Sequence, residues 1–583
     1  MKLKKFSPLL RGVAATTAAL LTVSTVGYGI AKSPLAVGWV DGYFGVETRD
    51  IWEEREVQGT RAFKKQHSSL TDFADALVAH GIKQGEEGFA LMKNDNKALP
   101  LASGTKVALF GWNAYNCPTG HTGVVAGNKP GEVTSGRPAT VVGSRYEKAV
   151  QITLYSAFSE MSGITVNDTI KAEDFSSAMK KAPGYAEYEI PEKFEAKNTW
   201  NIESTSTGIV VVGRGGGEGA NYKADAAVGA EDPLALSADE LAMIKYAKEH
   251  CAKVVVLVAS ANAMELGPIS KGGTHEVDAI GFCGIPNDYQ YGGIANVLAG
   301  KANATGAMSD TYVYDNSFNP ATINMGEQQY ADKDSIGFSS IDEDPFKRFN
   351  QPKDSTEKTP LTADNLNAPW YIVQAEGIYV GYKYYETRYY DGIANADFKA
   401  NDKAGSRTGS AWNYSDEVLY TFGHGLSYIP YTQEVTNVKV DLSENGNVTA
   451  TVKVSNTGTE DGKFLAQLYV QRPYTEYDIT NKVEKAAVDF LNSKKVEVKA
   501  GKSVDVEIEI PTKYLASWDS NGAKTYILDE GDYYFTAAAG AHEAVNNFLT
   551  AQNKSTDGKT SGSGKATVWN ELKKLDKTTF ATS

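Results

Sequence analysis

The spacing of apolar residues first points to strands alternating with helices. A continuous β-branched run at 208–213 and an apolar run at 254–259 are typical of strands buried on both faces of a parallel sheet. Between them, 237–240 fits a helical capping box, and Leu241 and Ile244 continue with helical spacing. Strand, helix and strand in this order predict parallel pairing with a right-handed connection.

Three further elements extend this pattern toward both ends. Residues 70–77 follow helical spacing and predict an amphipathic helix that ends at Gly81. Residues 106–110 predict a short strand, and 293–298 predict a helix. We therefore expect an α/β sandwich domain over 80–345, in which a mixed or parallel sheet is flanked by helices.

Apolar and polar residues alternate from Tyr431 onward. The alternation is clearest at 448–454, at 468–470 and at 504–510, with turn signals between these runs. A period of two predicts strands that bury one face. The economical fold for 431–548 is an immunoglobulin-like β-sandwich.

Two segments lack a clear period. Residues 346–430 are rich in Pro, Asp, Lys and Tyr, and we expect a loop-rich extension that packs on the sheet domain. Residues 549–583 turn to Lys, Ser, Thr and Gly, with a Ser-Gly run at 561–564. We expect a flexible linker and tail there, with a helix start at 568–575.

Composition and charge narrow the class of protein. The 583 residues allow about four domains, and 42% hydrophobic with 22% charged residues is typical of chains that fold in water. Lys and Arg number 58 against 72 Asp and Glu, a net charge of −14, which disfavours nucleic acid and anionic lipid as main partners. The 32 tyrosines suit stacking on sugar rings or packing in β cores, and the second use is favoured.

No metal or cofactor motif is legible. Cys117, Cys251 and Cys283 are widely spaced without a CxxC pair, and the seven histidines contain no HExxH. Residues 215–220 formally fit the dinucleotide pattern GxGxxA, but no helix follows directly. The sequence therefore predicts neither a metal site nor a cofactor, and it contains no GxSxG elbow for serine chemistry.

The first 31 residues resemble an export signal. Four basic residues precede an uncharged, Ala- and Thr-rich stretch at 12–31. This pattern fits either a cleaved signal or a retained membrane anchor, and we favour the anchor, with 32–79 as a lead-in segment. In both cases we expect an extracellular or cell-surface protein, with N-terminal membrane contact if the anchor is retained.

One loop stands out as a place for chemistry. Ligands of open α/β sheets bind beyond the carboxyl ends of the strands, and the strand 208–213 ends in a glycine-rich turn that contains Glu218. Glycoside hydrolysis requires two carboxyl groups. The other acidic residues near apparent turns, each with a purely structural alternative, are Glu86, Glu87, Glu265, Glu376 and Glu386.

Five ordered blocks carry a resemblance to a known family. They include EEGFALMKN at 86–94 and FGHGLSY at 422–428, together with the segments 213–222, 277–301 and 377–388. The blocks resemble the C-terminal α/β domain of glycoside hydrolase family 3, the β-glucosidase family. In that family the last block leads into a fibronectin type III-like domain, which matches the sandwich expected here. The resemblance covers about residues 80–545.

The resemblance implies a retaining, exo-acting glycosidase. In the family a nucleophilic Asp comes from a separate (β/α)8 barrel, and the acid/base Glu comes from a loop of the domain seen here. Glu218 matches one form of that acid/base motif, although Asn221 and Tyr222 stand where the family usually has an Asp-Arg pair. We therefore expect Glu218 to be catalytic and Arg214, Asn221 and Tyr222 to contact substrate.

The barrel itself is not found in the sequence. A (β/α)8 barrel needs about 250 residues in eight strand-helix repeats, and no such stretch is present. One hypothesis is a β-glucosidase-type hydrolase of reversed domain order that acts on oligosaccharides or aryl β-glycosides. Its sequence would then be either cut short before the barrel or completed in trans by a separately encoded barrel. The other is a non-catalytic, envelope-attached protein that binds carbohydrate or acts as a scaffold.

Overall fold

The computed structural model describes most of the chain beyond residue 70. The described residues are mainly 70–116, 152–175, 194–214, 234–324, 374–395 and 402–581, with short gaps and isolated pieces elsewhere. Residues 77–134 and 150–583 form one compact unit. The elements discussed below belong to this unit, apart from the first residues of helix α3.

A six-stranded sheet forms the centre of the first domain. Its strand order is β1-β10-β9-β8-β2-β5, and all neighbours pair in parallel except β1, which runs antiparallel to β10. The strands are β1 (Ala90–Asn94), β2 (Thr105–Phe110), β5 (Ile164–Val166), β8 (Thr207–Arg214), β9 (Lys253–Ser260) and β10 (Ala279–Phe282). The mixed, mostly parallel sheet predicted from the sequence is confirmed.

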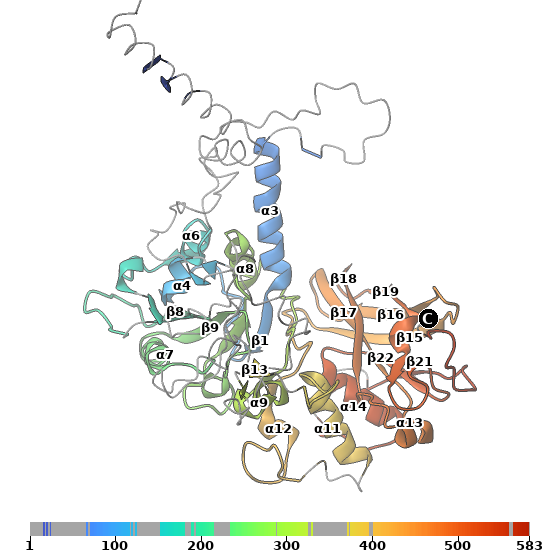
Figure 1. The fold of residues 1–583 in the computed structure, drawn as a ribbon. Coiled ribbons are helices and arrows are strands. Elements are labelled where there is room, and N and C mark those ends of the chain that lie inside the picture. The colour runs from blue at the N-terminus through green and yellow to red at the C-terminus, as the bar shows by residue number, and fades with distance from the viewer. Residues whose placement is uncertain are drawn as a thin grey trace, which may run out of the picture. The chain divides into compact units, whose positions relative to one another are not determined.

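Helices cover both faces of this sheet. The helices in this part of the chain are α3 (Leu70–Gly88), α4 (Trp112–Tyr115), α6 (Leu154–Ser159), α7 (Ala238–His250), α8 (Gln290–Leu298) and α9 (Pro320–Asn324). Helices α6 and α8 lie on one side of β8 and β9 and α7 lies on the other (Figure 1), and each side has its own hydrophobic core. All eight residues of β8 are buried, as a two-faced core strand requires.

The predicted stop at Gly81 in the first helix is wrong. Helix α3 continues through Gly81 and Gly85 to Gly88. A Cβ on residue 81 would lie 2.7 Å from the Cβ of Tyr289, and one on residue 85 would collide with the backbone carbonyl of Gln290. These glycines are therefore needed for the close approach of α3 to the start of α8, rather than to end the helix.

The region expected to be loop-rich contains a substantial helix. Helix α11 (Tyr382–Ala394) begins after Gly381, whose φ of 56° is left-handed, and the short α12 (Tyr414–Glu417) leads into β14 (Val418–Tyr420). Strand β14 pairs with β11 (Tyr312–Val313) of the sheet domain. Helix α11 instead packs with α14 (Ala541–Ala551) of the second domain, where Tyr389 donates a hydrogen bond to Asn546.

The second domain is a β-sandwich of two antiparallel sheets. Their strand orders are β15-β16-β19 and β18-β17-β22-β23. The strands are β15 (Tyr431–Val440), β16 (Asn447–Asn456), β17 (Gly462–Gln471), β18 (Asp489–Val498), β19 (Ser503–Pro511), β22 (Tyr533–Ala537) and β23 (Thr567–Trp569). The predicted sandwich is confirmed, and buried residues alternate along β16 as expected.

Strand β17 departs from the predicted one-sided burial. Its last six residues, 466–471, are all buried. Leu468 and Val470 face the core between the two sheets, whereas Tyr469 belongs to a second cluster with α11 and α14. The outer face of this strand is covered by helices, and a two-faced strand loses its alternating pattern.

The segment after 563 is part of the sandwich. The predicted helix start at 568–575 is wrong, because β23 pairs with β22 and Trp569 is only 5% exposed. Leu528 and Asp576 form a further antiparallel bridge. Val568 and Trp569 form only a short apolar run between polar residues. This run becomes a strand because it forms hydrogen bonds with the free edge of β22.

Shorter elements complete the described chain. Small two-stranded ladders join β3 (Pro118–Thr119) to β4 (Gly123–Val124), β6 (Ser177–Lys180) to β7 (Tyr188–Pro191), β12 (Gln328–Gln329) to β13 (Trp370–Tyr371) and β20 (Ser517–Asp519) to β21 (Thr525–Ile527). Helix α13 (Glu476–Asn481) follows β17.

A buried charged cluster joins α11 to α14. The imidazole of His542 lies between two carboxylates, with Nδ1 2.9 Å from Glu386 and Nε2 2.9 Å from Asp557. The ring of Tyr414 stacks on His542 at 3.9 Å, and its hydroxyl donates to Glu386. Burial lowers the pKa of His542, but the two carboxylates outweigh burial and raise it to about 9. The histidine is therefore a buried cation at neutral pH.

This cluster predicts a loss of stability at alkaline pH. The pKa of His542 is raised from about 6.5 to about 9 on folding, so its contribution is complete below pH 6.5 and is lost as the pH rises through 9. The expected loss is about 3 kcal/mol between these limits. Urea unfolding at a series of pH values measures it, and His542→Gln should flatten the profile. An equally steep alkaline decline in His542→Gln would contradict this assignment.

Candidate functional site

The carboxyl edge of the parallel sheet is built around a buried ion pair. Strand β8 ends at Arg214, whose side chain is fully buried. Its guanidinium donates to both carboxylate oxygens of Glu240, at 2.7 and 2.8 Å, and to the carbonyls of Gly213 and Ala235. Two parallel bonds to one carboxylate are the strongest arrangement available to an arginine. The pair fixes the point at which the chain leaves the sheet.

Glu240 also completes the cap of helix α7. The Ser237 hydroxyl accepts a hydrogen bond from the Glu240 amide, and Glu240 Oε2 accepts one from the Ser237 amide at 2.9 Å. The capping box predicted from the sequence is confirmed. One carboxylate therefore holds both the start of α7 and the end of β8, so the sheet edge and the helix terminus are locked together.

Gly213 packs closely against α4, which follows β2, and against the end of β9. A Cβ at this position would overlap the side-chain amide of Asn113 on α4 and would stand 3.1 Å from the carbonyl of Ala259. Asn113 follows Gly111, which turns the chain after β2 with a φ of 95°. Glycine is therefore required at 213, because three strand ends converge there.

Only one of the four predicted site residues lies among the described residues. Glu218, Asn221 and Tyr222 lie in 215–233, outside the described residues. Arg214 is described, and its guanidinium donates hydrogen bonds to Glu240 and to two backbone carbonyls. Its substrate contact stays a prediction, but the geometry gives it a structural role that sequence reasoning missed. The sequence did contain a signal for this role, because the Glu of a helical capping box can also pair with an arginine at the end of a strand.

The other acidic candidates have structural partners. Glu86 accepts a hydrogen bond from Asn296 at 2.7 Å, and Glu265 accepts one from the amide of Asn316 at 2.6 Å. Glu87 pairs with Lys463 of the sandwich at 2.7 Å. Their structural alternative is therefore favoured.

The same holds for Glu386. Its carboxylate is completely buried and accepts hydrogen bonds from Tyr414, Thr421 and His542. A carboxylate without solvent access and with all these donors has no route to a sugar. Glu376 is half-buried and also takes part in an interaction.

The motif at 422–428 serves the junction between the two domains. The Nε2 of His424 lies 2.8 Å from the carbonyl of Met92 in β1, and burial lowers the pKa of this histidine. A Cβ on residue 425 would collide with the carbonyl of Gly306, and one on residue 423 with the hydroxyl of Tyr469. The most specific block of the sequence therefore packs two domains together rather than carrying chemistry.

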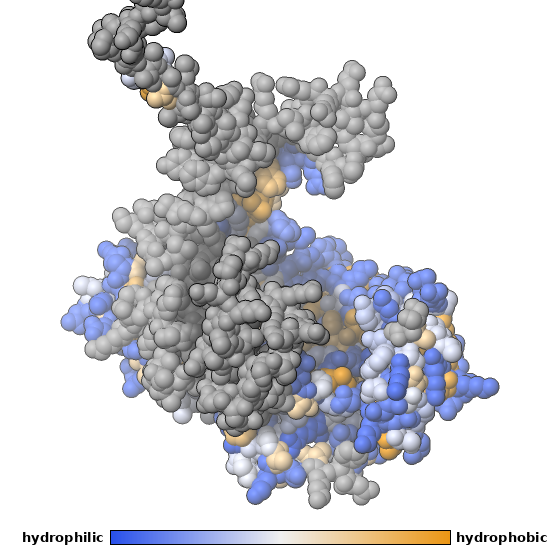
Figure 2. Space-filling model, in the orientation of Figure 1, coloured by the Kyte–Doolittle hydropathy of each residue, from blue (hydrophilic) through white to orange (hydrophobic). Residues whose placement is uncertain are grey.

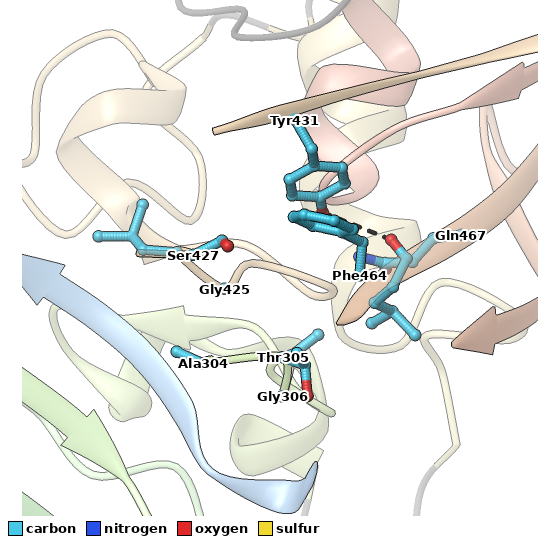
Figure 3. Close-up of a pocket in the computed structure, with 11 residues that line it drawn as sticks. Ala304, Thr305, Gly306, Gly425, Ser427, Tyr431, Phe464 and Gln467 are labelled. Atoms are coloured by element: carbon cyan, nitrogen blue, oxygen red, sulfur yellow. Dashed lines mark hydrogen bonds between the residues drawn. The ribbon is translucent and has the colours of Figure 1, made fainter. Parts of the chain in front are cut away.

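Neither of two cavities offers a sugar site. The cavity at the domain junction holds about 10 Å³, the room of one water molecule, between Thr305, Ser427 and Phe464 (Figure 3). A groove of about 400 Å³ has adequate size but lies at the amino ends of β2, β8 and β9. Its lining carboxylate, Glu203, is paired with Lys106. Ligands of such sheets bind at the opposite edge.

The described residues contain neither a metal-binding cluster nor a helix that could span a membrane. No group of three or more His, Cys, Asp or Glu side chains there is placed to hold a metal ion. Within the same residues, no helix has the length and apolar character that crossing a membrane needs. The predicted signal or anchor at 1–31 lies almost entirely outside the described residues.

Comparison with known families decides the class of protein. Residues 89–428 match the glycosyl hydrolase family 3 C-terminal domain, and residues 465–541 match a fibronectin type III-like domain. The chain belongs to glycosyl hydrolase family 3. The resemblance of the five sequence blocks is confirmed, and the two matches fall on the α/β domain and on the β-sandwich.

The relatives of this family 3 chain are bacterial and fungal β-glucosidases. It is 24% identical over 351 residues to a β-glucosidase from Ruminococcus albus, covering 59% of this chain and 28% of the relative. With β-glucosidase A from Butyrivibrio fibrisolvens it shares 24% identity over 489 residues, covering 77% and 48%. The chain thus spans less than half the length of these two relatives.

Solved structures share the fold of this family 3 chain. A β-glucosidase from Paenibacillus barengoltzii superposes with a TM-score of 0.53 at 20% identity, covering 86% of this chain and 44% of that one. β-Glucosidase 3B from Thermotoga neapolitana in complex with glucose gives a TM-score of 0.53 at 21% identity, covering 81% and 53%. At these identities the likeness shows the fold alone.

Removing Glu240 should destabilise the sheet edge far more than removing a surface glutamate. Glu240→Ala removes the carboxylate that accepts two hydrogen bonds from the buried Arg214 guanidinium, and breaking such a buried pair costs about 3–5 kcal/mol. The matched control is Glu249→Ala, on the same helix, where the exposed pair with Lys245 is worth about 0.5 kcal/mol or less. Urea unfolding of both variants measures the difference. Equal costs for the two variants would show that the buried pair does not hold this edge.

Proposed function

We propose that this chain supplies the acid/base half of a retaining β-glycosidase that removes terminal sugars from oligosaccharides or aryl β-glycosides. The single observation that carries the proposal is the position of Glu218 in a family 3 domain. It lies four residues after Arg214, where β8 ends at the carboxyl edge of the parallel sheet. The carboxyl edge of a parallel sheet, where β8 ends, is the edge at which α/β folds bind ligands.

The chemistry assigned to Glu218 is general acid and then general base catalysis. In the first step, the protonated carboxyl donates its proton to the glycosidic oxygen while a nucleophilic carboxylate attacks the anomeric carbon. The carbon–oxygen bond to the leaving group breaks, and a covalent glycosyl-enzyme forms. In the second step, the Glu218 carboxylate takes a proton from water, whose oxygen attacks the anomeric carbon and releases the sugar with retained configuration.

The nucleophile is assigned to a (β/α)8 barrel outside this 583-residue sequence. Family members that match this chain are more than twice its matched length in the Ruminococcus albus and Butyrivibrio fibrisolvens examples. A barrel of about 250 residues would account for part of that difference. We propose that the barrel is contributed either by the remainder of a longer protein or in trans, and that the assembled enzyme works outside the cytoplasmic membrane.

The anchoring of the loop root supports this division of labour. A catalytic carboxyl must be held in place against a substrate bound by another domain. The bidentate pair of Arg214 with Glu240 and the tight packing of Gly213 against Asn113 give the loop a rigid start. Arg214, Asn221 and Tyr222 are proposed to help hold the sugar or the carboxyl group.

The test is hydrolysis of an unactivated β-glucoside, such as phenyl β-glucoside, whose leaving oxygen needs a proton, by the purified chain, alone and mixed with the barrel encoded nearest to it. We expect activity only in the mixture. Glu218→Gln should lower kcat/KM by about 10² to 10⁴ and should remove the alkaline decline of its pH profile, because an amide has no proton to lose. Glu249→Gln, an exposed change on α7, should leave both unchanged.

Three outcomes would contradict the proposal. Full activity of the chain without a barrel would remove the need for a second domain. Activity that survives Glu218→Gln with an unchanged pH profile would remove the acid/base assignment. Absence of hydrolysis in every mixture would favour the alternative of a non-catalytic protein that binds carbohydrate or acts as a scaffold.

A further inference from the structure

The exposed aromatic rings of the described chain are concentrated in the sandwich. Most tyrosines pack in cores, for example Tyr115 and Tyr533, which are 1% exposed. Within the described residues, the aromatic side chains that are exposed are Phe73, Tyr474, Tyr514, Trp518 and Tyr526. Four of these five lie between 474 and 526. Packing in the cores therefore explains most tyrosines, but it does not explain the exposed rings of the sandwich.

Trp518 and Tyr526 form an exposed ring pair on one hairpin. They stand directly opposite each other on β20 and β21, with ring centroids 5.2 Å apart and planes at 69°. Trp518 is 47% exposed and Tyr526 is 42% exposed. Their strand neighbours Ser517, Asp519, Thr525 and Ile527 are all buried. The outward face of this hairpin is therefore made of these two rings.

The polar tips of both rings are available to a ligand. Within the described part of the chain, neither the Trp518 indole N–H nor the Tyr526 hydroxyl has a hydrogen-bond partner. Rings with an apolar face and a free polar tip suit ligands that combine both characters.

The turn beneath the rings is held rigidly. Asp519 is fully buried, and its carboxylate accepts hydrogen bonds from the amides of Asn521, Gly522 and Ala523 and from the hydroxyl of Tyr477. Burial raises the pKa of Asp519, but these donors outweigh burial and lower it. The carboxylate thus stays charged and keeps the turn in one conformation, so the rings above it are positioned before any ligand arrives.

The rim of the hairpin is nearly uncharged. Among residues 517–527 two side chains are charged: Asp519, which is buried, and Lys524, which is exposed. The exposed turn residues Ser520 and Asn521 are neutral and can form hydrogen bonds. On the face that Figure 2 draws, the sandwich surface is mainly hydrophilic with isolated apolar residues. A protein partner would favour a broad apolar patch, and an anion would favour basic side chains.

We propose that the Trp518–Tyr526 hairpin binds a neutral glycan chain, separately from the catalytic site. One pyranose ring stacks its C–H face on Trp518, Tyr526 forms the adjoining wall, and sugar hydroxyls meet the ring tips and the turn residues. Such a surface would keep a polymer close to the enzyme without taking part in hydrolysis. It does not depend on Glu218.

The test is affinity electrophoresis of the full chain in gels that contain a soluble, neutral mixed-linkage β-glucan. The wild-type chain should be retarded, and Trp518→Ala should weaken the interaction about tenfold. Tyr526→Ala should also weaken it, whereas Trp518→Phe should retain part of it because a stacking face remains. Since both rings are exposed, the variants should fold, and unchanged thermal unfolding confirms this.

Tyr474→Ala is the matched control, because Tyr474 is 56% exposed but lies outside the hairpin. It should bind the glucan as the wild type does. The proposal is overturned if the wild type is not retarded, if Trp518→Ala binds normally, or if Tyr474→Ala loses as much as Trp518→Ala. It is also overturned if Trp518→Ala changes only the oligomeric state, since the occupant would then be a second copy. The assay measures no hydrolysis, so its result is independent of the proposed function.

Discussion

A buried arginine must have a partner, and this requirement shapes the carboxyl edge of the sheet. Arg214 ends a strand that is buried along its whole length, so its charge cannot reach water at that point. Glu240 supplies two hydrogen bonds and simultaneously caps α7. Breaking such a pair leaves an uncompensated charge in the core, which few domains can tolerate. The end of β8, the start of α7 and the root of the following loop are therefore fixed together.

Close packing and paired charges also fix the contact between the α/β domain and the sandwich. Glycines at 423 and 425 bring the chain close to Tyr469 and Gly306, and Lys495 of the sandwich donates to the carbonyl of Glu87 at the end of α3. Below this junction, the charged cluster around His542 ties α11 to α14. These contacts combine close backbone approach with paired charges. Such contacts define one geometry, whereas apolar contacts alone would tolerate sliding.

The sequence predicted those elements whose pattern is local. The strand β8, the capping box at Ser237 and the alternation along β16 were all recognised, because each depends on neighbouring residues. The prediction that the first helix ends at Gly81 was wrong, because this glycine allows close approach to Tyr289 and does not end the helix. The end of β17 and the strand β23 were missed, because their burial depends on helices and edges far away in the sequence.

The candidate site was only partly accessible to sequence reasoning. The family motif points to Glu218, whose role stays a proposal, and the pairing of Arg214 with Glu240 became visible only once β8 and α7 were brought together. The leaving group offers the most direct measurement of the Glu218 role. In the assembled enzyme, Glu218→Ala should lose about 10² to 10⁴ in kcat/KM for an unactivated alkyl β-glucoside, whose leaving oxygen needs a proton. It should keep near wild-type kcat/KM for a dinitrophenyl β-glucoside, whose leaving group needs none. An equal loss with both substrates, or no loss with either, would contradict the account.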